Sequence, residues 1–435
     1  MKVIVLAAGE GKRMWPIQTD KCLIPFLGKP LLYHNLKKIQ EALNPEEVII
    51  TANPESKDQI SKILSEVGLT GTVVIQQEPK GMHDSILSAK DLIEGEVLIV
   101  NAQDILDPEA FKKDMDGEVV LRGIKVDKYF PGGYLKVTGD SVQGIVEKPG
   151  EGNEPSDLVK LVVDYFKDGK KLVSYLEKIT SDEDDHYEKA ISQMISDGVE
   201  IKFISYSGTW IPLKYPWQIL DITAYFLSTI EQQISSGAKV SEKAIIEGKV
   251  VIEDGAKVFE GAVIKGPCYI GKNVIVGTNT MVRESSLEEG CVTGFNSDIT
   301  RSYIGANSWF HTNYIGDSVI EGDFGMGSGA VLANLRLDDH TIRVKVGDPS
   351  TSSGQEDLDS GRHKLGLTAG KGSRVGVNAS TMPGVKIGSN SLVGPGVTLY
   401  DDVPDNKKIL VKQEYEITDH TPALTSYDQF REKLK

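Results

Sequence analysis

The sequence has few cysteines and tryptophans, and it lacks any long apolar run. It contains 3 cysteines and 4 tryptophans in 435 residues. Cys22, Cys268 and Cys291 lie far apart and form no CxxC or Cys/His spacing, so neither a disulfide framework nor a zinc site is expected. A membrane-spanning helix needs about 20 apolar residues in succession, and no stretch approaches that length. We therefore expect no membrane association.

The first residues also lack the features of a secretion signal. MKVIVLAAG has no separate basic region, no long apolar stretch and no cleavage site. This stretch predicts a first β-strand, and the expected location of the protein is cytoplasmic.

Positive charge is in the minority. Lys and Arg number 48 against 63 Asp and Glu, which gives a formal net charge of −15, and no long basic run is present. Nucleic-acid backbones are bound mainly through clusters of cations, so no nucleic-acid partner is expected. Any phosphate group that the protein binds is expected to be small and held by a few local residues.

The length and composition are sufficient for two ordinary globular domains. A chain of 435 residues exceeds what one hydrophobic core usually supports. Its hydrophobic content of 40% and charged content of 26% are typical of folded proteins.

From residue 1 to about 230, short β-branched segments alternate with segments of helical periodicity. The predicted strands are VIVLAA (3–8), EVIITA (47–52), TVVIQQ (72–77) and VLIVNA (97–102). Between them, NLKKIQEAL and SKDQISKILSEVG repeat apolar residues at spacings of three and four. This alternation predicts a Rossmann-like α/β domain with a mostly parallel sheet, whose ligands bind at the carboxyl ends of the strands.

Near residue 240 the pattern changes to a six-residue repeat. A branched residue recurs every six positions, and a small or modest side chain follows four residues after each. Helices and ordinary alternating strands do not produce this spacing, whereas a β-helix does; a chance run of apolar residues in a β-sandwich is the weaker alternative. The repeat is interrupted between about 284 and 374. Its positions are Val240, Ile246, Ile252, Val258, Ile264, Ile270, Val276, Val282, and then Val375, Thr381, Ile387, Val393 and Leu399.

These patterns predict four parts: a domain at 1–225, the end of a connecting helix at 226–239, a β-helix at 240–410 and a tail at 411–435. The segment PWQILDITAYFLSTIEQQISSG (216–237) is interpreted as that helix, ending at Gly237. GDPSTSSGQEDLDSG (347–361) is polar and rich in Gly and Ser, which is typical of a flexible loop. After residue 404 the chain is polar, with a short helix expected near its end.

The loop after the first predicted strand combines glycine with fixed positive charge. Gly9 and Gly11 allow a tight turn that brings successive N–H groups near an anion, and Arg13 and Lys21 supply charge. The GxxxxGK[ST] pattern and the third glycine of dinucleotide loops are absent. Together these residues suit a nucleoside triphosphate, whereas Arg13 or Lys21 alone would be interpreted as a solvated surface charge.

The wider string resembles the sugar-1-phosphate nucleotidylyltransferases, whose opening pattern is LAAGxGTRMxP, then a Lys, then Pro and GKP. The matching residues are LAAGEGKRM, Pro16, Lys21, Pro25 and GKP at 28–30, and the resemblance extends from the start of the chain to about position 225. It implies a nucleotidyltransferase fold that transfers a nucleotidyl group from UTP or dTTP to a sugar 1-phosphate and releases pyrophosphate.

The resemblance also implies residue roles. Arg13 and the loop amides would bind the leaving pyrophosphate, and Lys21 the phosphates near the reacting centre. Asp104 would hold Mg²⁺, although an Asp at a strand end is also typical of a turn or cap. Gly133 and Glu147 would contact the sugar phosphate. The implied nucleotide-binding residues are Leu6, Ala8, Gly9, Gly11, Gln76 and Gly81.

Some positions depart from the family pattern. Lys12 replaces Thr, Gln103 replaces Gly, Met82 stands where the family has Thr or Leu, and an Asn is expected close to Lys160. The largest departure concerns the second metal carboxylate, which the family places in a W-x-D pattern.

In this chain the W-x-D positions read Trp210, Ile211, Pro212. Proline has no carboxylate, so Mg²⁺ would have to bind through Asp104 and the substrate phosphates. A regulatory subunit that binds nucleotide sugars without transferring them is the alternative.

The segment SWFHTNYIGDSVIEGDFGMGSGAVLANLR (308–336) resembles the left-handed β-helix acetyltransferase domain of archaeal-type bifunctional enzymes that make UDP-N-acetylglucosamine. The resemblance implies acetyl-CoA-dependent N-acetylation of an amino-sugar 1-phosphate by a homotrimer. His311 suits the proton acceptor because its ordinary pKa lies near neutrality, and Asn334 would orient the amine or the imidazole. A purely structural trimerisation module is the alternative.

Further positions follow from the same resemblance. Acetyl-CoA would contact Ser328 and Val377. Arg362, Lys364 and Arg374 could bind the phosphates of coenzyme A or be solvated charges. The implied sugar-phosphate-binding residues are Arg283, Arg301, Tyr314, His340 and Arg343.

Overall fold

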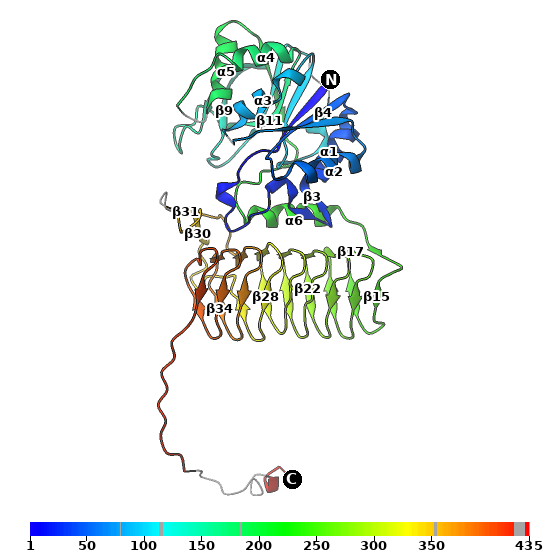
Figure 1. The fold of residues 1–435 in the computed structure, drawn as a ribbon, viewed down its shortest axis with the longest axis vertical. Helices are drawn as coiled ribbons and strands as arrows, with labels where there is room; N and C mark the ends of the chain where they lie inside the picture. The colour runs from blue at the N-terminus through cyan, green and yellow to red at the C-terminus, as the bar shows by residue number, and fades with distance from the viewer. Residues whose placement is uncertain (79, 113–115, 183–184, 352–354, 422–430, 435) are drawn as a thin grey trace.

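The computed structural model describes residues 1–435 except 79, 113–115, 183–184, 352–354, 422–430 and 435. Two bodies lie one above the other (Figure 1). We call residues 1–229 the N-terminal body and residues 233–410 the solenoid. Residues 411–421 run away from the solenoid without secondary structure, and most of the helix expected near the chain end lies outside the described residues.

A mixed sheet of nine strands forms the centre of the N-terminal body. Four strands at one side run parallel, as predicted, but β11 (Leu158–Phe166) is antiparallel to both neighbours, and β9 (Gly133–Thr138) and β10 (Ser141–Glu147) form an antiparallel hairpin. The expectation of a mostly parallel sheet is therefore correct only for the half of the sheet that contains these four parallel strands. In spatial order the strands are β5 (Gly71–Ile75), β4 (Glu47–Ala52), β1 (Lys2–Leu6), β6 (Val97–Asn101), β11 (Leu158–Phe166), β8 (Val119–Lys125), β12 (Ile201–Tyr206), β10 (Ser141–Glu147) and β9 (Gly133–Thr138).

Helices cover both faces of this sheet because alternate strand residues point to opposite sides. Val3 and Val5 pack with α1 (Leu31–Leu43) and α2 (Lys57–Val67) on one face. Ile4 packs on the other face, with α3 (Met82–Ser88), α4 (Gly169–Leu176) and α5 (His186–Ser196).

Short elements connect these layers. The two-stranded pairs are β2 (Pro25–Phe26) with β3 (Lys29–Pro30), and β7 (Ile105–Leu106) with β13 (Trp210–Ile211). The 3₁₀ turns are η1 (Lys12–Met14), η2 (Lys21–Leu23), η3 (Lys90–Leu92) and η4 (Pro108–Phe111).

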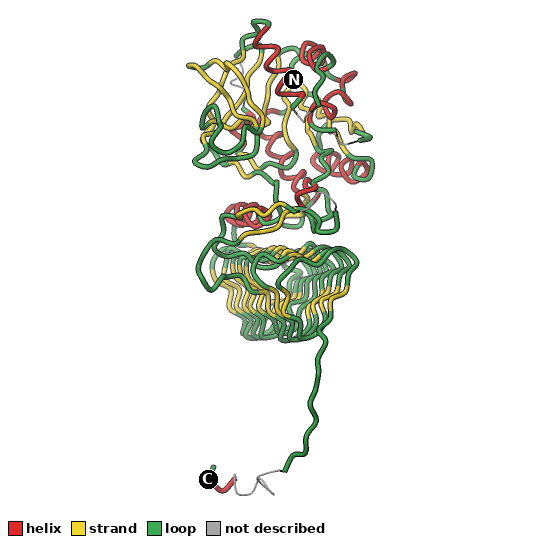
Figure 2. The backbone as a smooth tube through the Cα atoms, turned by 90° about the vertical axis from the view of Figure 1, so that its left-hand side faces the viewer, coloured by secondary structure: helices red, strands yellow, loops and turns green. Residues whose placement is uncertain are grey.

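The solenoid consists of stacked parallel strands in the arrangement expected of a hexapeptide β-helix (Figures 1 and 2). Lys239 pairs with Lys257 and Ile245 with Val263, so one coil consists of three six-residue units. The repeated branched residues from Ile252 onward are buried in its interior.

Three rows of strands run along the solenoid. The first row is β14 (Gln233–Ile234), β17 (Val250–Ile252), β20 (Cys268–Ile270), β23 (Ser286–Leu287), β25 (Tyr303–Ile304), β27 (Val319–Ile320), β32 (Thr368–Ala369) and β35 (Lys386–Ile387). The second is β16 (Ile245–Glu247), β19 (Val263–Lys265), β22 (Met281–Arg283), β24 (Asp298–Thr300), β26 (Tyr314–Gly316), β29 (Val331–Leu332), β34 (Ser380–Thr381) and β37 (Thr398–Leu399). The third is β15 (Lys239–Val240), β18 (Lys257–Val258), β21 (Ile275–Val276), β28 (Gly325–Met326), β33 (Arg374–Val375), β36 (Leu392–Val393) and β38 (Lys408–Ile409), with isolated bridges at Val292 and Trp309 between β21 and β28.

The stretch in which the repeat is interrupted still belongs to the solenoid. Met281 pairs with Asp298 and Asp298 with Tyr314, so these two coils are successively shorter than the coils before them. The shortening removes corner residues, which shifts the six-residue register without ending the stack. The interruption also includes an antiparallel ribbon of β30 (Arg343–Val346) and β31 (Glu356–Asp359).

Two local predictions were wrong. The connecting helix α6 (Gln218–Thr229) ends well before Gly237, because Gln233 and Ile234 pair with β17 as part of the first coil. The predicted flexible loop at 347–361 contains β31, which is held by pairing with β30, and its residues 352–354 lie outside the described residues.

The two bodies share an apolar core. Met14 and Ile17, from the loop of the N-terminal body, pack in one buried cluster with Tyr303, Val319 and Val344 of the solenoid and its ribbon. All three cysteines are buried and unpaired. In the part of the chain that the structure describes, no helix has the length and apolarity needed to cross a membrane.

Candidate functional site

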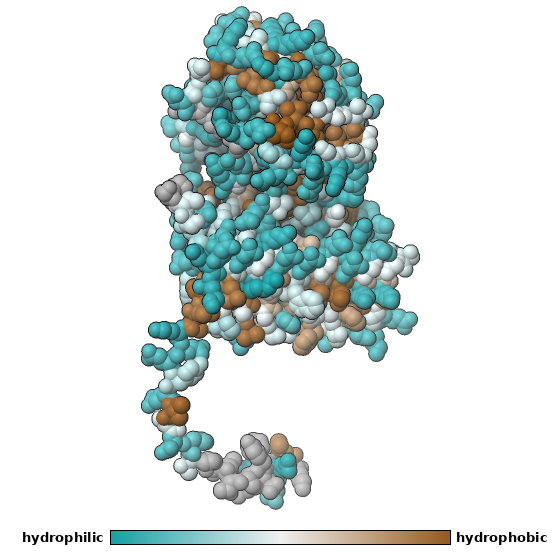
Figure 3. Space-filling view, viewed as in Figure 1, coloured by the Kyte–Doolittle hydropathy of each residue, from teal (hydrophilic) through white to brown (hydrophobic). Residues whose placement is uncertain are grey.

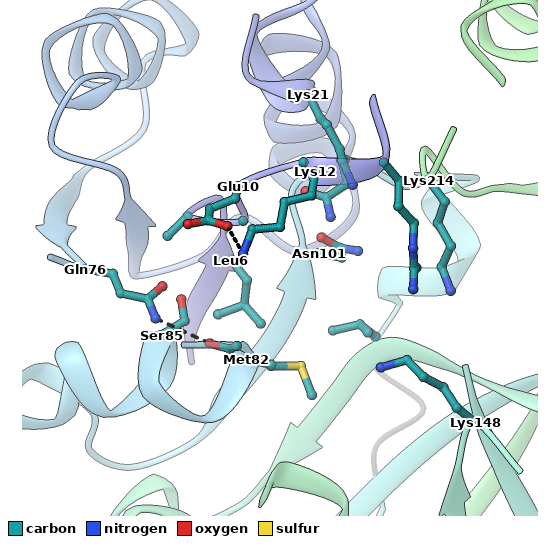
Figure 4. Close-up of a pocket in the computed structure, with 17 residues that line it drawn as sticks. Leu6, Glu10, Lys12, Lys21, Gln76, Met82, Ser85, Asn101, Lys148 and Lys214 are labelled. Carbon is teal, nitrogen blue, oxygen red and sulfur yellow. Dashed lines mark hydrogen bonds and ion pairs between the residues drawn. The ribbon is translucent and has the colours of Figure 1, made fainter. Parts of the chain in front are cut away.

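A cavity of about 460 Å³ opens at the carboxyl end of β1 (Figure 4). It adjoins a second cavity of about 300 Å³, and Arg13, Lys21 and Lys214 line both. The first cavity collects these predicted residues: Leu6, Ala8, Gly9, Gly11, Arg13, Lys21, Gln76 and Gly81. The second cavity adds Asp104, Gly133 and Glu147.

The glycine loop leaves room for Lys21. Gly11 has φ +66°, in the left-handed region that favours glycine, and a Cβ there would lie 3.4 Å from Lys21 Cε. Lys12 forms an ion pair of 2.6 Å with Glu10 (Figure 4). Gln76 is oriented by its side-chain amide, which donates to Asp84 at 2.9 Å.

Lys214 is a cavity residue that sequence reasoning missed. Lys21, Lys148 and Lys214 project toward the same space from different elements (Figure 4). Burial lowers the pKa of Lys214 to about 8, although Asp104 opposes the shift, and burial also lowers the pKa of Lys21. Among the described residues, Lys21 and Lys214 have no carboxylate within ion-pair distance, so the cavity presents unneutralised positive charge.

Lys214 is held at the cavity wall by contacts with residues of one loop. Its Nζ lies 3.8 Å from the centroid of the Phe130 ring and donates to the carbonyl oxygen of Pro131. It follows Pro212 by two positions. The only sequence signal was therefore a lysine just beyond the position where a carboxylate was missing.

Asp104 lies beside Trp210 because β7 and β13 pair antiparallel. Its carboxylate accepts hydrogen bonds from Trp210 Nε1 and Asn101 Nδ2, each at 3.2 Å. Burial raises the pKa of Asp104, while these hydrogen bonds and the nearby lysines oppose the rise.

The protein groups around Asp104 do not complete a metal site by themselves. Pro212 supplies no donor, and the described residues contain no cluster of three His, Cys, Asp or Glu side chains placed to bind a metal ion. A cation here would have Asp104 as its protein ligand and would depend on substrate oxygens and water, an arrangement that suits Mg²⁺.

The second cavity also contains an acidic group, Glu188, that the sequence did not point to. Burial raises the pKa of Glu188 to about 7, with Glu147 adding to the rise and Lys160 opposing it. Lys160 is buried and forms an ion pair of 2.6 Å with Asp164. Glu147 pairs with Lys148 at 3.1 Å.

A third cavity, of about 380 Å³, lies on the third row of solenoid strands. His311 and Arg374 line it together with Trp309, Met326 and Leu392, so its walls are mostly apolar. The structure thus places His311, the predicted proton acceptor, in an open groove that is bordered by Arg374.

The solenoid residues predicted for acetyl transfer fall into two groups. His311, Ser328 and Val377 follow one another along a single corner, where Gly329 N donates to Thr312 O and Asn378 N to Ser328 O. Asn334 forms the other group; like Ser328 and Val377, it lies outside the lining of the third cavity.

Asn334 belongs to a network on the second row of strands. Its Nδ2 donates to Asp317 at 2.5 Å, and Tyr314 donates to its Oδ1 at 3.4 Å. Arg301 donates twice to Asp317 at 2.8 Å, and Arg283 pairs with Asp298 at 3.0 Å.

The remaining predicted cations lie elsewhere. His340 is exposed, and Arg343 pairs with Asp357 within the ribbon at 3.1 Å. Arg362 pairs with Asp221 of α6, at the contact between the two bodies. Lys364 forms an isolated antiparallel bridge with Leu335.

Comparison with known proteins defines the class. A family model for nucleotidyl transferases matches residues 2–211, and a model for six repeats of the bacterial transferase hexapeptide matches residues 249–284. These matches describe a transferase with a nucleotidyltransferase part and a hexapeptide part.

Full-length relatives define the family. The chain is 31% identical over 415 residues to a bifunctional sugar-1-phosphate nucleotidylyltransferase/acetyltransferase from Sulfurisphaera tokodaii, covering 93% of this chain and 98% of that protein. It is 30% identical over 422 residues to the bifunctional protein GlmU of Methanocaldococcus jannaschii, covering 95% and 98%. The chain belongs to this family of bifunctional nucleotidylyltransferase/acetyltransferase enzymes.

A solved structure is similar to part of the chain. The inositol-1-phosphate CTP transferase from T. maritima is 19% identical and has a TM-score of 0.44, covering 50% of this chain and 90% of that protein.

Proposed function

We propose that the chain catalyses two steps of nucleotide-sugar synthesis. The N-terminal body transfers a nucleotidyl group from UTP or dTTP to a sugar 1-phosphate, and the solenoid transfers an acetyl group from acetyl-CoA to the amine of an amino-sugar 1-phosphate. The observation that carries the proposal is the joined pair of cavities at the end of β1, where Arg13, Lys21 and Lys214 converge near Asp104. Family membership supports both reactions.

In the nucleotidyl reaction, an oxygen of the sugar 1-phosphate attacks the α-phosphorus, and pyrophosphate leaves. Such transfers depend on positioning and on neutralising charge rather than on covalent help from the protein. Gln76 and Gly81 bind the base, and the amides of the Gly9–Gly11 loop with Arg13 bind the leaving pyrophosphate. Lys21 and Lys214 neutralise the phosphates at the reacting centre, and Gly133 and Glu147 bind the sugar.

Mg²⁺ fits this site as an ion carried by the nucleotide. Asp104 is the protein carboxylate that would hold it, and the ion would supply charge neutralisation across the phosphates. Since Pro212 removes the second carboxylate of the family pattern, Lys214 takes over part of the positive charge that the site needs.

In the acetyl reaction, the amine nitrogen attacks the carbonyl carbon of the thioester. A C–N bond forms, the C–S bond breaks, the coenzyme A thiolate leaves, and His311 accepts the proton lost by the amine. Ser328 and Val377 contact acetyl-CoA along the His311 corner, and Arg374 at the cavity edge suits its phosphates.

We propose a homotrimer whose acetyl sites lie between copies. In one chain, Asn334 belongs to a network on the second row of strands and does not line the His311 cavity; a trimer would place the Asn334 of one copy near the His311 of the next. Exposed apolar side chains on the solenoid support this, including Trp309, which is 56% exposed, and Phe295, which is 55% exposed. Figure 3 shows apolar patches along the lower part of the solenoid.

The proposal includes three further points. The solenoid is left-handed, which the hexapeptide repeats support. The functional units have the bounds 1–225 and 240–410, joined at 226–239 and followed by a tail at 411–435. Both reactions take place in the cytoplasm.

Two separate assays of the purified protein test the function. Pyrophosphate release is measured with UTP or dTTP and a panel of sugar 1-phosphates, and thiol release with acetyl-CoA and amino-sugar 1-phosphates. Lys21→Ala should abolish only the first reaction and His311→Ala only the second. Nucleotide binding without turnover in the parent protein would overturn the nucleotidyl assignment and favour a regulatory subunit.

A further inference from the structure

The loop that carries Arg13 and Lys21 is held in place by the solenoid. Between η1 and η2 this loop runs through residues 15–20 without regular structure. We propose that Glu321 and Asp405 of the solenoid are positioning residues for nucleotidyl transfer. They clamp residues 15–20, which connect Arg13 to Lys21 along the chain. The inference rests on the proposed nucleotidyl reaction and adds the second body of the protein to that site.

Glu321 binds one end of the loop through a single carboxylate oxygen. Its Oε1 accepts hydrogen bonds from Gln18 N at 2.9 Å, Thr19 N at 2.7 Å and the Thr19 hydroxyl at 2.8 Å. Its Oε2 accepts from Lys371 N at 2.8 Å, which anchors the side chain to the next coil. Hydrogen bonds to an ionised acceptor are stronger than neutral ones, so Glu321 joins this part of the loop firmly to the solenoid.

Asp405 binds the other end of the loop. Its Oδ1 accepts from Trp15 Nε1 at 3.1 Å and from Ser389 N at 2.8 Å, and its Oδ2 accepts from Gln18 Nε2 at 3.0 Å. The Trp15 ring also lies 4.7 Å from Lys386 Nζ. The carboxylate thus connects the loop to two neighbouring segments of the solenoid.

Apolar packing supports the same contact. Met14 and Ile17 are buried in the core that both bodies share. A Cβ on Gly370 would lie 2.7 Å from the carbonyl oxygen of Pro16, so the backbones themselves approach closely. The loop therefore has little freedom to move while the solenoid is docked.

The clamped residues lie next to the phosphate-binding cations. Arg13 precedes Trp15 by two positions, and Lys21 follows Thr19 by two. A misplacement of about 1 Å in such groups can lower a rate by about 100-fold. The clamp therefore acts on the transition state through Arg13 and Lys21, while the residues that bind the sugar belong to other elements.

Glu321→Ala in the full-length protein tests the proposal. We expect the kcat of nucleotidyl transfer to fall by at least about 10-fold, with little change in the KM for the sugar 1-phosphate and no change in acetyl transfer. Glu321→Gln keeps one acceptor oxygen and should recover part of the rate. Glu260→Ala is the matched control, because Glu260 is an exposed glutamate of the solenoid.

Hydrogen exchange provides a readout that does not depend on turnover. Amides in a peptide covering residues 12–23 should exchange faster in Glu321→Ala and Asp405→Ala than in the parent or in Glu260→Ala. If the parent shows no nucleotidyl turnover, the proposed reaction fails, but faster exchange still supports the clamp. Unchanged exchange, or an unchanged kcat in an active Glu321→Ala enzyme, would overturn the inference.

Discussion

The indole N–H of Trp210 donates a hydrogen bond of 3.2 Å to the carboxylate of Asp104. This contact places the start of β13 beside the candidate cation ligand. Two positions further along the chain, the site that the family pattern gives to a second carboxylate is Pro212. Lys214 then enters the same cavity. Residue 212 therefore adds no second carboxylate beside Asp104, and the nearby lysine is Lys214.

Restoring the missing carboxylate should strengthen metal binding. We expect Pro212→Asp to bind Mn²⁺, used as a probe in the presence of a non-hydrolysable nucleotide, at least about 10-fold more tightly, comparable to the effect of other ligand-supporting groups in metal sites. Electron paramagnetic resonance measures the concentration of free Mn²⁺. Pro212→Ala controls for loss of the ring alone, and equal affinities in the two variants would show that residue 212 does not reach the ion.

Removing Lys214 should impair nucleotidyl transfer. A hydrogen bond to a charged group contributes about 1.5–3 kcal/mol, so Lys214→Ala should lower kcat/KM by about 10- to 100-fold. Lys62→Ala, at an exposed position of α2, is the control. If Lys214→Ala matches the control in the rate of pyrophosphate release, Lys214 only supports the loop that carries Phe130.

Gly11→Ala should strain the phosphate loop. An alanine in the left-handed region costs about 1–2 kcal/mol, and its Cβ would also contact the Lys21 side chain. A cost of this size lowers the melting temperature by about 2–8 °C in a domain of about 150–250 residues. Gly9→Ala, whose Cβ would meet no atom within 4 Å, should melt like the parent. Equal melting temperatures for both variants would contradict the assigned loop geometry.

His311→Ala should remove acetyl transfer while sparing the nucleotidyl reaction. Loss of a general base typically costs about 100- to 10,000-fold in rate, and His311 lies on a different body from Arg13 and Lys21. The control is His363→Ala, at an exposed histidine near the ribbon. Thiol release from acetyl-CoA is the measurement, and a rate within threefold of the parent would exclude His311 as the base.

Glu188 should make stability depend on pH. Burial raises its pKa in the folded protein to about 7, above the ordinary value of 4.5. Between these two values the folded state binds more protons than the unfolded state, so the contribution of Glu188 to stability falls as the pH rises.

The matching measurement compares Glu188→Gln with the parent. The melting temperature of the variant minus that of the parent should increase as the pH rises from the ordinary pKa of 4.5 to the raised value of about 7. Above pH 7 this difference should stay constant. Glu260→Gln, at an exposed site, should show no such trend. A constant difference across this range would mean that the pKa of Glu188 is the same in the folded and unfolded states.

Much of the architecture could be predicted from the sequence because it depends on local repetition. The branched residues from Ile252 to Val282 repeat every six positions, and each lies in the solenoid interior. The strands β1, β4 and β6 were likewise predicted from short β-branched runs.

Features that depend on pairing between distant segments could not be predicted in the same way. The antiparallel placement of β11 follows from its neighbours in space, and the shortened coils hide the repeat between Met281 and Tyr314. No sequence motif marks Lys214 as a residue of the site. The contact between Thr19 and Glu321 joins residues 302 positions apart, and neither residue has a local signal for it.

The solenoid is a stack of similar coils, and such stacks usually tolerate the gain or loss of one unit. Here the N-terminal body rests on several coils at once: Glu288 accepts a hydrogen bond from Gly28 N, and Glu321 and Asp405 hold the loop before Lys21. Adding or deleting a coil between Glu288 and Asp405 would move one of these attachment points by the height of a coil. The N-terminal body therefore fixes the number of coils between Glu288 and Asp405.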